Sequence, residues 1–63
     1  MQYYVGETRY QKGMSLRQLA EQAHISKSYL QRIEAGEAKP SLEIMVRLAQ
    51  VLESSLETLY RAE

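Results

Sequence analysis

Apolar residues recur along this chain at intervals of three and four positions, without the strict alternation that a half-buried strand would show. Gly13, Gly36 and Pro40 interrupt this pattern and divide it into short segments. The periodicity therefore predicts an all-α protein of five short helices that pack as a small bundle.

The first expected helix runs roughly from Tyr3 to Lys12 and ends at Gly13, because glycine is a usual residue just past a helix C-terminus. Gly6 lies inside this helix at a cost of about 1 kcal/mol relative to alanine. Thr8 stands where an apolar core residue is expected. We therefore expect tertiary packing to hold this helix in place.

The second expected helix has a clear start. Ser15 can cap it, and Gln18 three residues later completes a Ser-x-x-Gln capping box. A tight break follows at His24 and Ile25. The inward face of this helix is expected to be Leu16, Leu19, Ala20 and Ala23.

Serine and proline mark the starts of the remaining helices. Ser26 is expected to cap the third helix, and Ser55 the fifth. Pro40 and Ser41 are expected to start the fourth. The predicted inward residues are Leu30 and Ile33 in the third helix, Leu42, Met45, Leu48, Ala49 and Leu52 in the fourth, and Leu56 and Leu59 in the fifth.

Length and composition restrict the possible classes of protein. Residues 1–63 are expected to form a single domain, near the lower limit at which one core offsets chain entropy without disulfides or metal. The chain contains no cysteine, which excludes disulfides, thiolate metal sites and cysteine nucleophiles. Packing must therefore supply the folding energy, and no cofactor or metal is implied.

The N-terminal segment is polar and lacks the basic region and apolar run of a signal peptide or membrane span. We therefore expect a cytoplasmic protein. The formal net charge is zero, whereas nucleic-acid binders usually present a basic surface. Residues 1–34 carry a small excess of positive charge, and the remainder carries an equal excess of negative charge. The zero net charge therefore argues less strongly against nucleic-acid binding.

The most informative stretch runs from Ser15 to Gly36 and reads S-L-R-Q-L-A-E-Q-A-H-I-S-K-S-Y-L-Q-R-I-E-A-G. It contains two short capped helices joined by a tight turn, which is a helix-turn-helix layout. Ala20 falls where the second helix passes close to the third, so that a small side chain is needed there. A larger residue would push the two helices apart.

This stretch resembles the phage-repressor and Cro-type (lambda repressor-like) helix-turn-helix family, and the resemblance extends from about Val5 to Tyr60. It rests on Gly13-Met14-Ser15, Leu19-Ala20, Ile25-Ser26, Ile33-Glu34-x-Gly36, Pro40-Ser41-Leu42 and Leu48-Ala49. The resemblance implies a five-helix repressor-like bundle in which residues Ser26–Ala35 form the recognition helix for duplex DNA.

The resemblance also implies roles for individual side chains. Base contacts are expected from Lys27, Ser28, Gln31 and Arg32, and phosphate contacts from Ser15, Arg17, Ser26 and Lys39. The chemistry suits these roles, because Arg and Lys donate to guanine in the major groove, Gln can pair with adenine, and helix N-termini bind phosphate. The alternative is that the base-contacting set is merely the solvated face of a surface helix.

In the family an arginine of the first helix commonly pairs with a glutamate of the third, and the matching residues here are Arg9 and Glu34. The resemblance implies a structural ion pair that orients the first helix and orders the loop near the DNA backbone. It contributes little net stability if it is exposed. The alternative is that Arg9 is a free phosphate contact.

The chain departs from the family at several phosphate-contacting positions. Leu16, Ala35 and Glu37 stand where family members often carry polar, basic or amide residues. Each lost contact lowers electrostatic affinity, and Glu37 would repel the DNA backbone. Lys12, Arg17 and Lys39 can compensate.

Two further departures concern helix ends. His24 and Glu53 replace glycines that usually follow the second and fourth helices, so both are expected to adopt left-handed geometry. His24 is therefore interpreted as a capping residue, since no Cys, Asp or second His is present to complete a catalytic or metal site. Ser54 occupies a usually apolar position and suggests a marginal or partner-dependent fold.

The sequence supports two classes of function. The first is a sequence-specific DNA-binding regulator, with a repressor favoured, that binds as a homodimer to half-sites about 34 Å apart. The second is a protein-interaction module of the same fold, which the neutral charge, Leu16 and Glu37 permit, with a toxin, sigma factor or sensor domain as partner. An enzyme is not expected, because no catalytic motif is present. The tyrosines suit either core packing or an interface with a second subunit.

Overall fold

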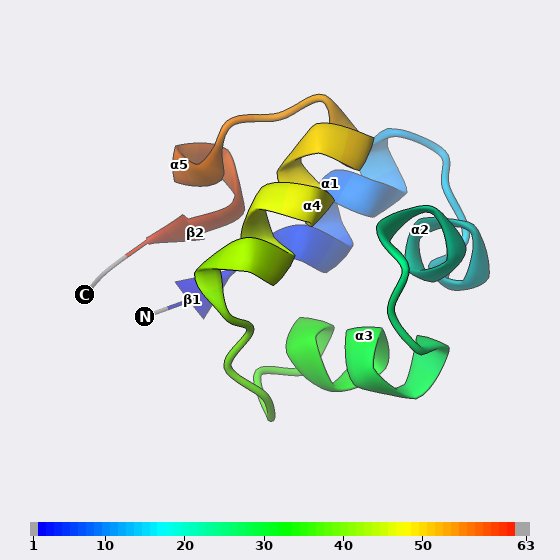
Figure 1. Cartoon of the computed structure of the whole chain (residues 1–63). Coiled ribbons are helices and arrows are strands. Elements are labelled where there is room, and N and C mark those ends of the chain that lie inside the picture. The colour runs from blue at the N-terminus through cyan, green and yellow to red at the C-terminus, as the bar shows by residue number, and fades with distance from the viewer. Residues whose placement is uncertain (1, 62–63) are drawn as a thin grey trace.

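The computed structural model describes residues 2–61 of the chain. This part forms five helices, α1 (Val5–Gln11), α2 (Leu16–Ala23), α3 (Lys27–Glu34), α4 (Leu42–Leu52) and α5 (Leu56–Leu59), and two short strands, β1 (Gln2–Tyr3) and β2 (Tyr60–Arg61). The helices pack around one core, with α3 at one edge of the molecule (Figure 1). The predicted all-α class is confirmed. No helix within residues 2–61 has the length and apolar character needed to cross a bilayer.

Serine side chains start four of these helices. The Oγ atom of Ser15 accepts a hydrogen bond from the backbone N–H of Gln18 at 3.0 Å, and the Gln18 side chain accepts one from the Ser15 N–H at 2.8 Å. This is the capping box expected from the sequence. At the starts of α3, α4 and α5 the side chains of Ser26, Ser41 and Ser55 also accept a backbone N–H hydrogen bond, without the reciprocal bond of the capping box.

Residues in the left-handed region follow four helices. Gly13 and Gly36 have φ angles of 72° and 79°, and His24 and Glu53 have φ angles of 59° and 53°. After each of these residues the next backbone N–H donates to a carbonyl oxygen in the last turn of the helix, for example from Ile25 to Ala20 at 3.0 Å. His24 and Glu53 therefore have the geometry expected for glycine replacements.

The core follows the predicted apolar periodicity closely. It comprises Val5, Leu19, Ala20, Ala23, Leu30, Ile33, Met45, Leu48, Ala49, Leu52 and Leu59. Thr8 is buried beside this cluster, and its hydroxyl donates a hydrogen bond to the Tyr4 carbonyl oxygen at 2.8 Å. The hydroxyl is therefore satisfied inside its own helix, and a polar residue is tolerated at this core position.

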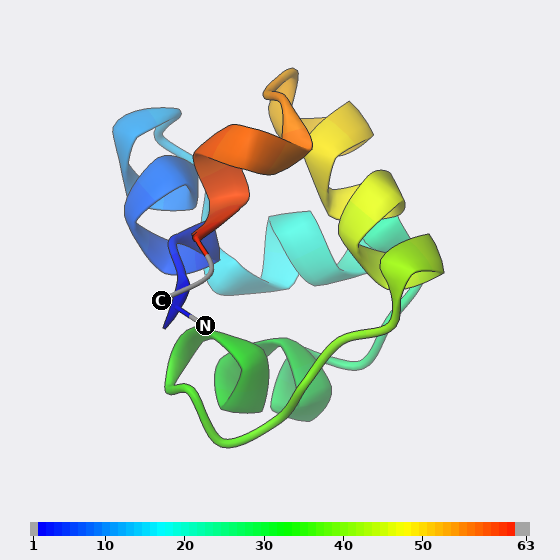
Figure 2. The same cartoon turned by 90° about the vertical axis from the view of Figure 1, so that its left-hand side faces the viewer.

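The first helix starts later than expected. Tyr3 lies in β1, which pairs with β2 in antiparallel register, and α1 begins at Val5. The Tyr4 N–H donates to the Leu59 carbonyl oxygen at 2.6 Å, which joins the ladder to the end of α5. The two paired strands lie together on one side of the bundle (Figure 2). The apolar pattern of the sequence does not predict this ladder.

A second correction concerns Leu42. It was expected to face the core, but 67% of its surface is exposed. Leu42 is the first residue of α4, directly after the capping Ser41, and the first buried residue of this helix is Met45. The apolar periodicity therefore placed this leucine inward although it lies at the exposed start of α4.

Candidate nucleic-acid interface

The α2–turn–α3 unit places one helix at the edge of the molecule. His24 reverses the chain after α2, and Ser26 begins α3 two residues later. Ala20 is 2% exposed and belongs to the core cluster that joins the two helices. The two helices can approach closely because this side chain is small. As Figure 1 shows, α3 lies along the lower edge of the bundle, where its outer face is open.

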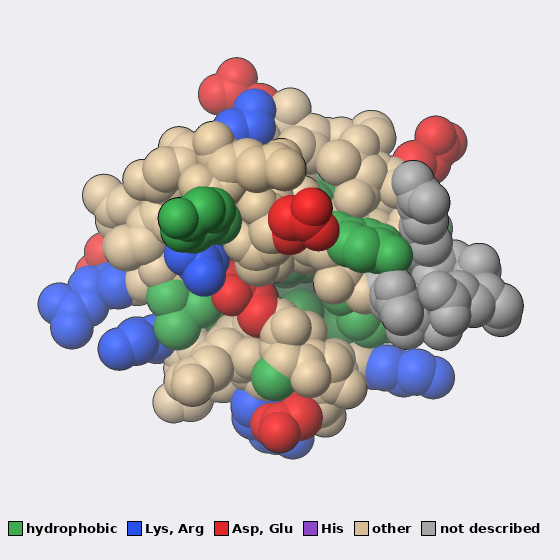
Figure 3. Space-filling view, turned by 180° about the vertical axis from the view of Figure 1, so that it is seen from behind, with side chains coloured by type: hydrophobic (Ala, Val, Ile, Leu, Met, Phe, Trp, Pro, Cys, Tyr) green, Lys and Arg blue, Asp and Glu red, His purple; other side chains and the backbone are tan. Residues whose placement is uncertain are grey.

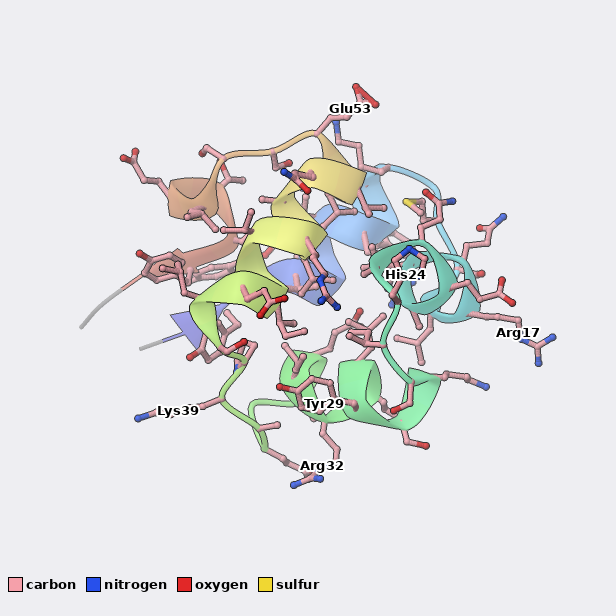
Figure 4. The ribbon with its side chains drawn as sticks, viewed as in Figure 1. Arg17, His24, Tyr29, Arg32, Lys39 and Glu53 are labelled. Atoms are coloured by element: carbon pink, nitrogen blue, oxygen red, sulfur yellow. The ribbon has the colours of Figure 1, made fainter. Side chains whose placement is uncertain are left out.

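The outer face of α3 carries the predicted base-contacting residues. Lys27, Ser28, Gln31 and Arg32 are all exposed, whereas Leu30 and Ile33 of the same helix are completely buried. Residues four positions apart share a face of a helix, so the exposed residues form a continuous polar surface. Arg32 extends away from the body of the protein (Figure 4). This surface has the donors and acceptors needed to read base edges in a major groove.

The predicted phosphate-contacting residues border this helix. Arg17 and Lys39 are exposed and extend outward on opposite sides of α3, from α2 and from the segment before α4 (Figure 4). Ser15 and Ser26 are exposed capping residues, and their Oγ atoms accept backbone hydrogen bonds. Each serine hydroxyl retains a proton to donate, next to the positive end of a helix dipole. These positions fit contacts to a DNA backbone on both sides of a groove.

Charge is unevenly distributed over the surface. The side chains that project from the lower edge in Figure 3 are mostly basic, although an acidic side chain also lies at the bottom. Glu53 lies at the end of the molecule opposite Arg32 (Figure 4). Glu34 is the last residue of α3 but is paired with Arg9. A neutral chain can therefore present a locally basic edge to a polyanion.

Arg9 connects three parts of the fold. Its Nε and Nη2 atoms donate to the two carboxylate oxygens of Glu34 at 2.9 and 3.0 Å, and its Nη1 atom donates to the Met14 carbonyl oxygen at 2.9 Å. Hydrogen bonding to Glu34 raises the pKa of Arg9 above its already high normal value, although partial burial lowers it. The structure thus favours the ion pair over a free phosphate contact for Arg9. Because Met14 precedes Ser15, the pair also joins α3 to the start of α2.

Gly6 lies against the Glu34 carboxylate, a role that its position in the sequence does not predict. A Cβ atom at this position would lie 2.8 Å from the Glu34 carboxylate oxygen Oε1 and 3.1 Å from its carboxylate carbon. The absence of a side chain therefore leaves room for the carboxylate that Arg9 holds. The only sequence signal was a glycine inside a helix, which by itself indicates a cost in helix propensity.

The departures from the family pattern have different structural settings. Leu16 is half-buried and packs against the core, so this position serves packing. Ala35 and Glu37 are exposed just after α3, and the Glu37 N–H donates to the Arg32 carbonyl oxygen at 2.9 Å. The backbone of Glu37 is therefore held next to the last turn of α3. Lys12 is exposed at the end of α1.

A capped two-helix unit, supported by three further helices and exposing the polar face of its second helix, defines a helix-turn-helix domain. The Helix-turn-helix family model matches residues 7–59, and the chain belongs to this family. The predicted resemblance to repressor-type helix-turn-helix proteins and the predicted repressor-like fold are thereby confirmed.

Two curated relatives illustrate the range of the family. An uncharacterized HTH-type transcriptional regulator of Mycobacterium tuberculosis, Rv0474, is 43% identical over 47 residues, which cover 75% of this chain and 34% of that protein. The HTH-type transcriptional regulator SinR of Bacillus subtilis is 39% identical over 56 residues, or 87% of this chain and 50% of SinR. The chain thus spans about a third to a half of the length of these relatives.

Solved structures of SinR have the same fold. SinR in complex with DNA matches with a TM-score of 0.80 at 38% identity, covering 86% of this chain and 87% of that one. A SinR–SinI protein complex matches with a TM-score of 0.80 at 38% identity, covering 86% of this chain and 53% of that one.

Proposed function

We propose that this chain is the sequence-specific DNA-binding domain of a transcriptional regulator and that it inserts α3 into the major groove of an operator. The observation that carries the proposal is the exposed polar face of α3, bordered by the cations Arg17 and Lys39. The regulators named among its relatives and the DNA complex of SinR support it. An operator lies on chromosomal DNA, so we place the protein in the cytoplasm. The regulators in its family also support the prediction that the chain is not an enzyme.

The proposal assigns two kinds of contact. Lys27, Ser28, Gln31 and Arg32 read base edges, and Ser15, Arg17, Ser26 and Lys39 hold the phosphate backbone. Base contacts set specificity, whereas phosphate contacts set register and much of the affinity. The Arg9–Glu34 pair touches no DNA in this arrangement and keeps the start of α2 in place relative to α3.

We further propose that the domain binds as a homodimer to a palindromic operator. Two copies of α3 then enter successive major grooves about 34 Å apart on one face of the duplex. The protein-interaction module remains the second candidate, because SinR is also known in a complex with the SinI protein. The basic edge around α3 favours DNA over that candidate.

Fluorescence anisotropy with a selected duplex and a scrambled duplex, at about 0.05 M and about 0.2 M salt, tests the proposal. We expect binding that prefers the selected duplex and weakens as salt is raised, because phosphate contacts release counterions. Equal binding to both duplexes would contradict sequence-specific recognition. Failure to bind either duplex at low salt would favour the protein-interaction module.

Two alanine variants separate the assigned contacts. Arg32→Ala should cost about 1–3 kcal/mol of binding free energy and relax specificity at one base position, because it removes a contact to a base edge. Lys39→Ala should weaken binding to all sequences alike and reduce the salt dependence. Binding selections and salt titrations with both variants check these expectations. A uniform loss in both variants would refute the assignment of Arg32 to base reading.

A further inference from the structure

The outer face of α3 has two boundaries with the core, one at Tyr29 and one at Glu34, and both residues are half-buried. Tyr29 lies between the exposed Arg32, three positions later, and the buried Ile33, four positions later. Glu34 lies at the opposite boundary, next to Gly6 of α1. An α-helix with its side chains is about 10–12 Å wide and the major groove about 12 Å, so the boundaries of a helix in the groove face its walls, where the phosphates lie.

The two boundary side chains differ in what their polar atoms already bind. The Glu34 carboxylate accepts two hydrogen bonds from Arg9. The Tyr29 hydroxyl makes no hydrogen bond to any residue within the described range 2–61, although the ring of Tyr29 packs against the core. At one boundary the polar group is therefore occupied by a contact within the fold, and at the other it is free to bind a ligand.

The ring of Tyr29 fixes the position of its hydroxyl before DNA binds. Tyr29 lies between Arg32 and the body of the bundle (Figure 4), and contact with the core restricts the ring. A long lysine or arginine side chain loses rotamer freedom when it binds, whereas a packed ring has already lost it on folding. Tyr29 thus offers a preorganised hydrogen-bond donor next to Arg32.

A neutral donor also fits the composition of this chain. The net charge is zero, and Leu16, Ala35 and Glu37 stand at positions where family members often contact phosphate. Phosphates accept hydrogen bonds from tyrosine as well as from cations. A cation that neutralises a phosphate releases counterions and makes binding more sensitive to salt, whereas an uncharged hydroxyl does not.

We propose that the Tyr29 hydroxyl donates a hydrogen bond to a phosphate at the wall of the major groove and so adds affinity without adding salt dependence. The proposal rests on the proposed DNA-binding function. Tyr29 then adds a neutral phosphate contact to the charged ones from Arg17 and Lys39. The bound domain therefore contacts more phosphates than the slope of its salt dependence indicates.

Tyr29→Phe tests the proposal, because it removes the hydroxyl and keeps the ring that packs against the core. Anisotropy titrations compare wild type and variant on a selected duplex and a scrambled duplex over a range of salt concentrations. Tyr29→Phe should bind both duplexes about tenfold weaker, because a hydrogen bond to a charged group is lost. The preference between the duplexes and the slope of log affinity against log salt should stay those of the wild type. The urea midpoint should also stay the same, because the hydroxyl has no partner within residues 2–61.

Tyr10→Phe is the matched control, because Tyr10 is 82% exposed on α1, and this variant should bind as the wild type does. Equal affinity of Tyr29→Phe and wild type would overturn the proposal and assign Tyr29 to packing alone. A loss confined to the selected duplex would overturn it as well, since that marks a base contact, and so would a changed salt slope. Failure of the wild-type protein to bind any duplex would instead contradict the proposed function itself.

Methylphosphonate duplexes identify the phosphate that is contacted. Each duplex of the series has a methyl group in place of one charged phosphate oxygen, at a different position of the selected sequence. At the contacted position this change should cost the wild-type protein more affinity than it costs Tyr29→Phe, because both changes remove the same hydrogen bond. Tyr10→Phe should give the wild-type profile. Equal losses for Tyr29→Phe and wild type at every position would refute the phosphate contact.

Discussion

Gly6 lies in α1 directly beside the carboxylate of Glu34. Replacing a glycine inside a helix with alanine normally stabilises it by about 1 kcal/mol. At Gly6 the added Cβ would lie 2.8 Å from the Glu34 oxygen Oε1, and Glu34 is held on its other side by two hydrogen bonds from Arg9. Glu34 can move away only by giving up that bidentate geometry.

We therefore expect Gly6→Ala to lower the free energy of unfolding by about 1–2 kcal/mol, as overpacking and the loss of charged hydrogen bonds do. Chemical denaturation of both proteins measures the difference. In a Glu34→Ala background the obstacle is gone, and the same glycine replacement should raise stability by up to about 1 kcal/mol. A stabilising Gly6→Ala in the wild-type background would show that Glu34 shifts at no cost.

The four residues with left-handed backbone after helices differ in the conformational free energy that this backbone costs them. Glycine adopts this conformation at little cost, whereas other residues pay about 1–2 kcal/mol. Glu53 has a φ angle of 53° after α4, in the same kind of turn that Gly13 makes after α1. The left-handed backbone at Glu53 therefore makes α4 less stable than it would be with glycine at this position.

Glu53→Gly should raise the free energy of unfolding by about 1 kcal/mol, because it relieves the left-handed backbone. Gly13→Ala is the matched opposite change: nothing lies within 4 Å of a Cβ atom there, so the backbone alone should make it destabilising. Thermal melts of the two variants should therefore shift in opposite directions. Shifts of the same sign would contradict the backbone explanation.

Helix ends were easier to predict from the sequence than contacts between distant segments. The serine caps and the ends at His24 and Glu53 were predictable because each depends on residues a few positions away. The β1–β2 ladder was not predictable, because it joins residues from the two ends of the chain and its strands are too short to show a period. Leu42 was misplaced because periodicity gives the face of a helix but not where the helix first meets the core.

For the whole molecule, the important quantity is the arrangement of charge, since the net charge is zero. The sequence predicted that several cations lie in or near α3. It did not predict whether the glutamates lie next to these cations. The fold pairs Glu34 with Arg9 and places Glu53 at the far end (Figure 4), whereas Glu37 stays next to α3. The charge of Glu37 therefore opposes the proposed binding.

Glu37→Lys should tighten binding to any duplex and make the logarithmic salt dependence steeper by about 0.9, the value for one added phosphate contact. Glu53→Lys makes the same change of charge at the opposite end and should leave the slope nearly unchanged, because salt screens distant charges. Anisotropy titrations over a range of salt concentrations measure both slopes. Equal effects of the two variants would mean that α3 does not face the DNA.

The pairing of β1 with β2 also has an architectural consequence. The first and last described segments of the chain, β1 and β2, lie next to each other. Domains with adjacent ends tolerate insertion into other proteins and rearrangement of their chain order. This bundle is therefore suited to serve as a cassette: a host protein can receive it at a single surface loop, with little separation between the points where the host chain breaks and resumes.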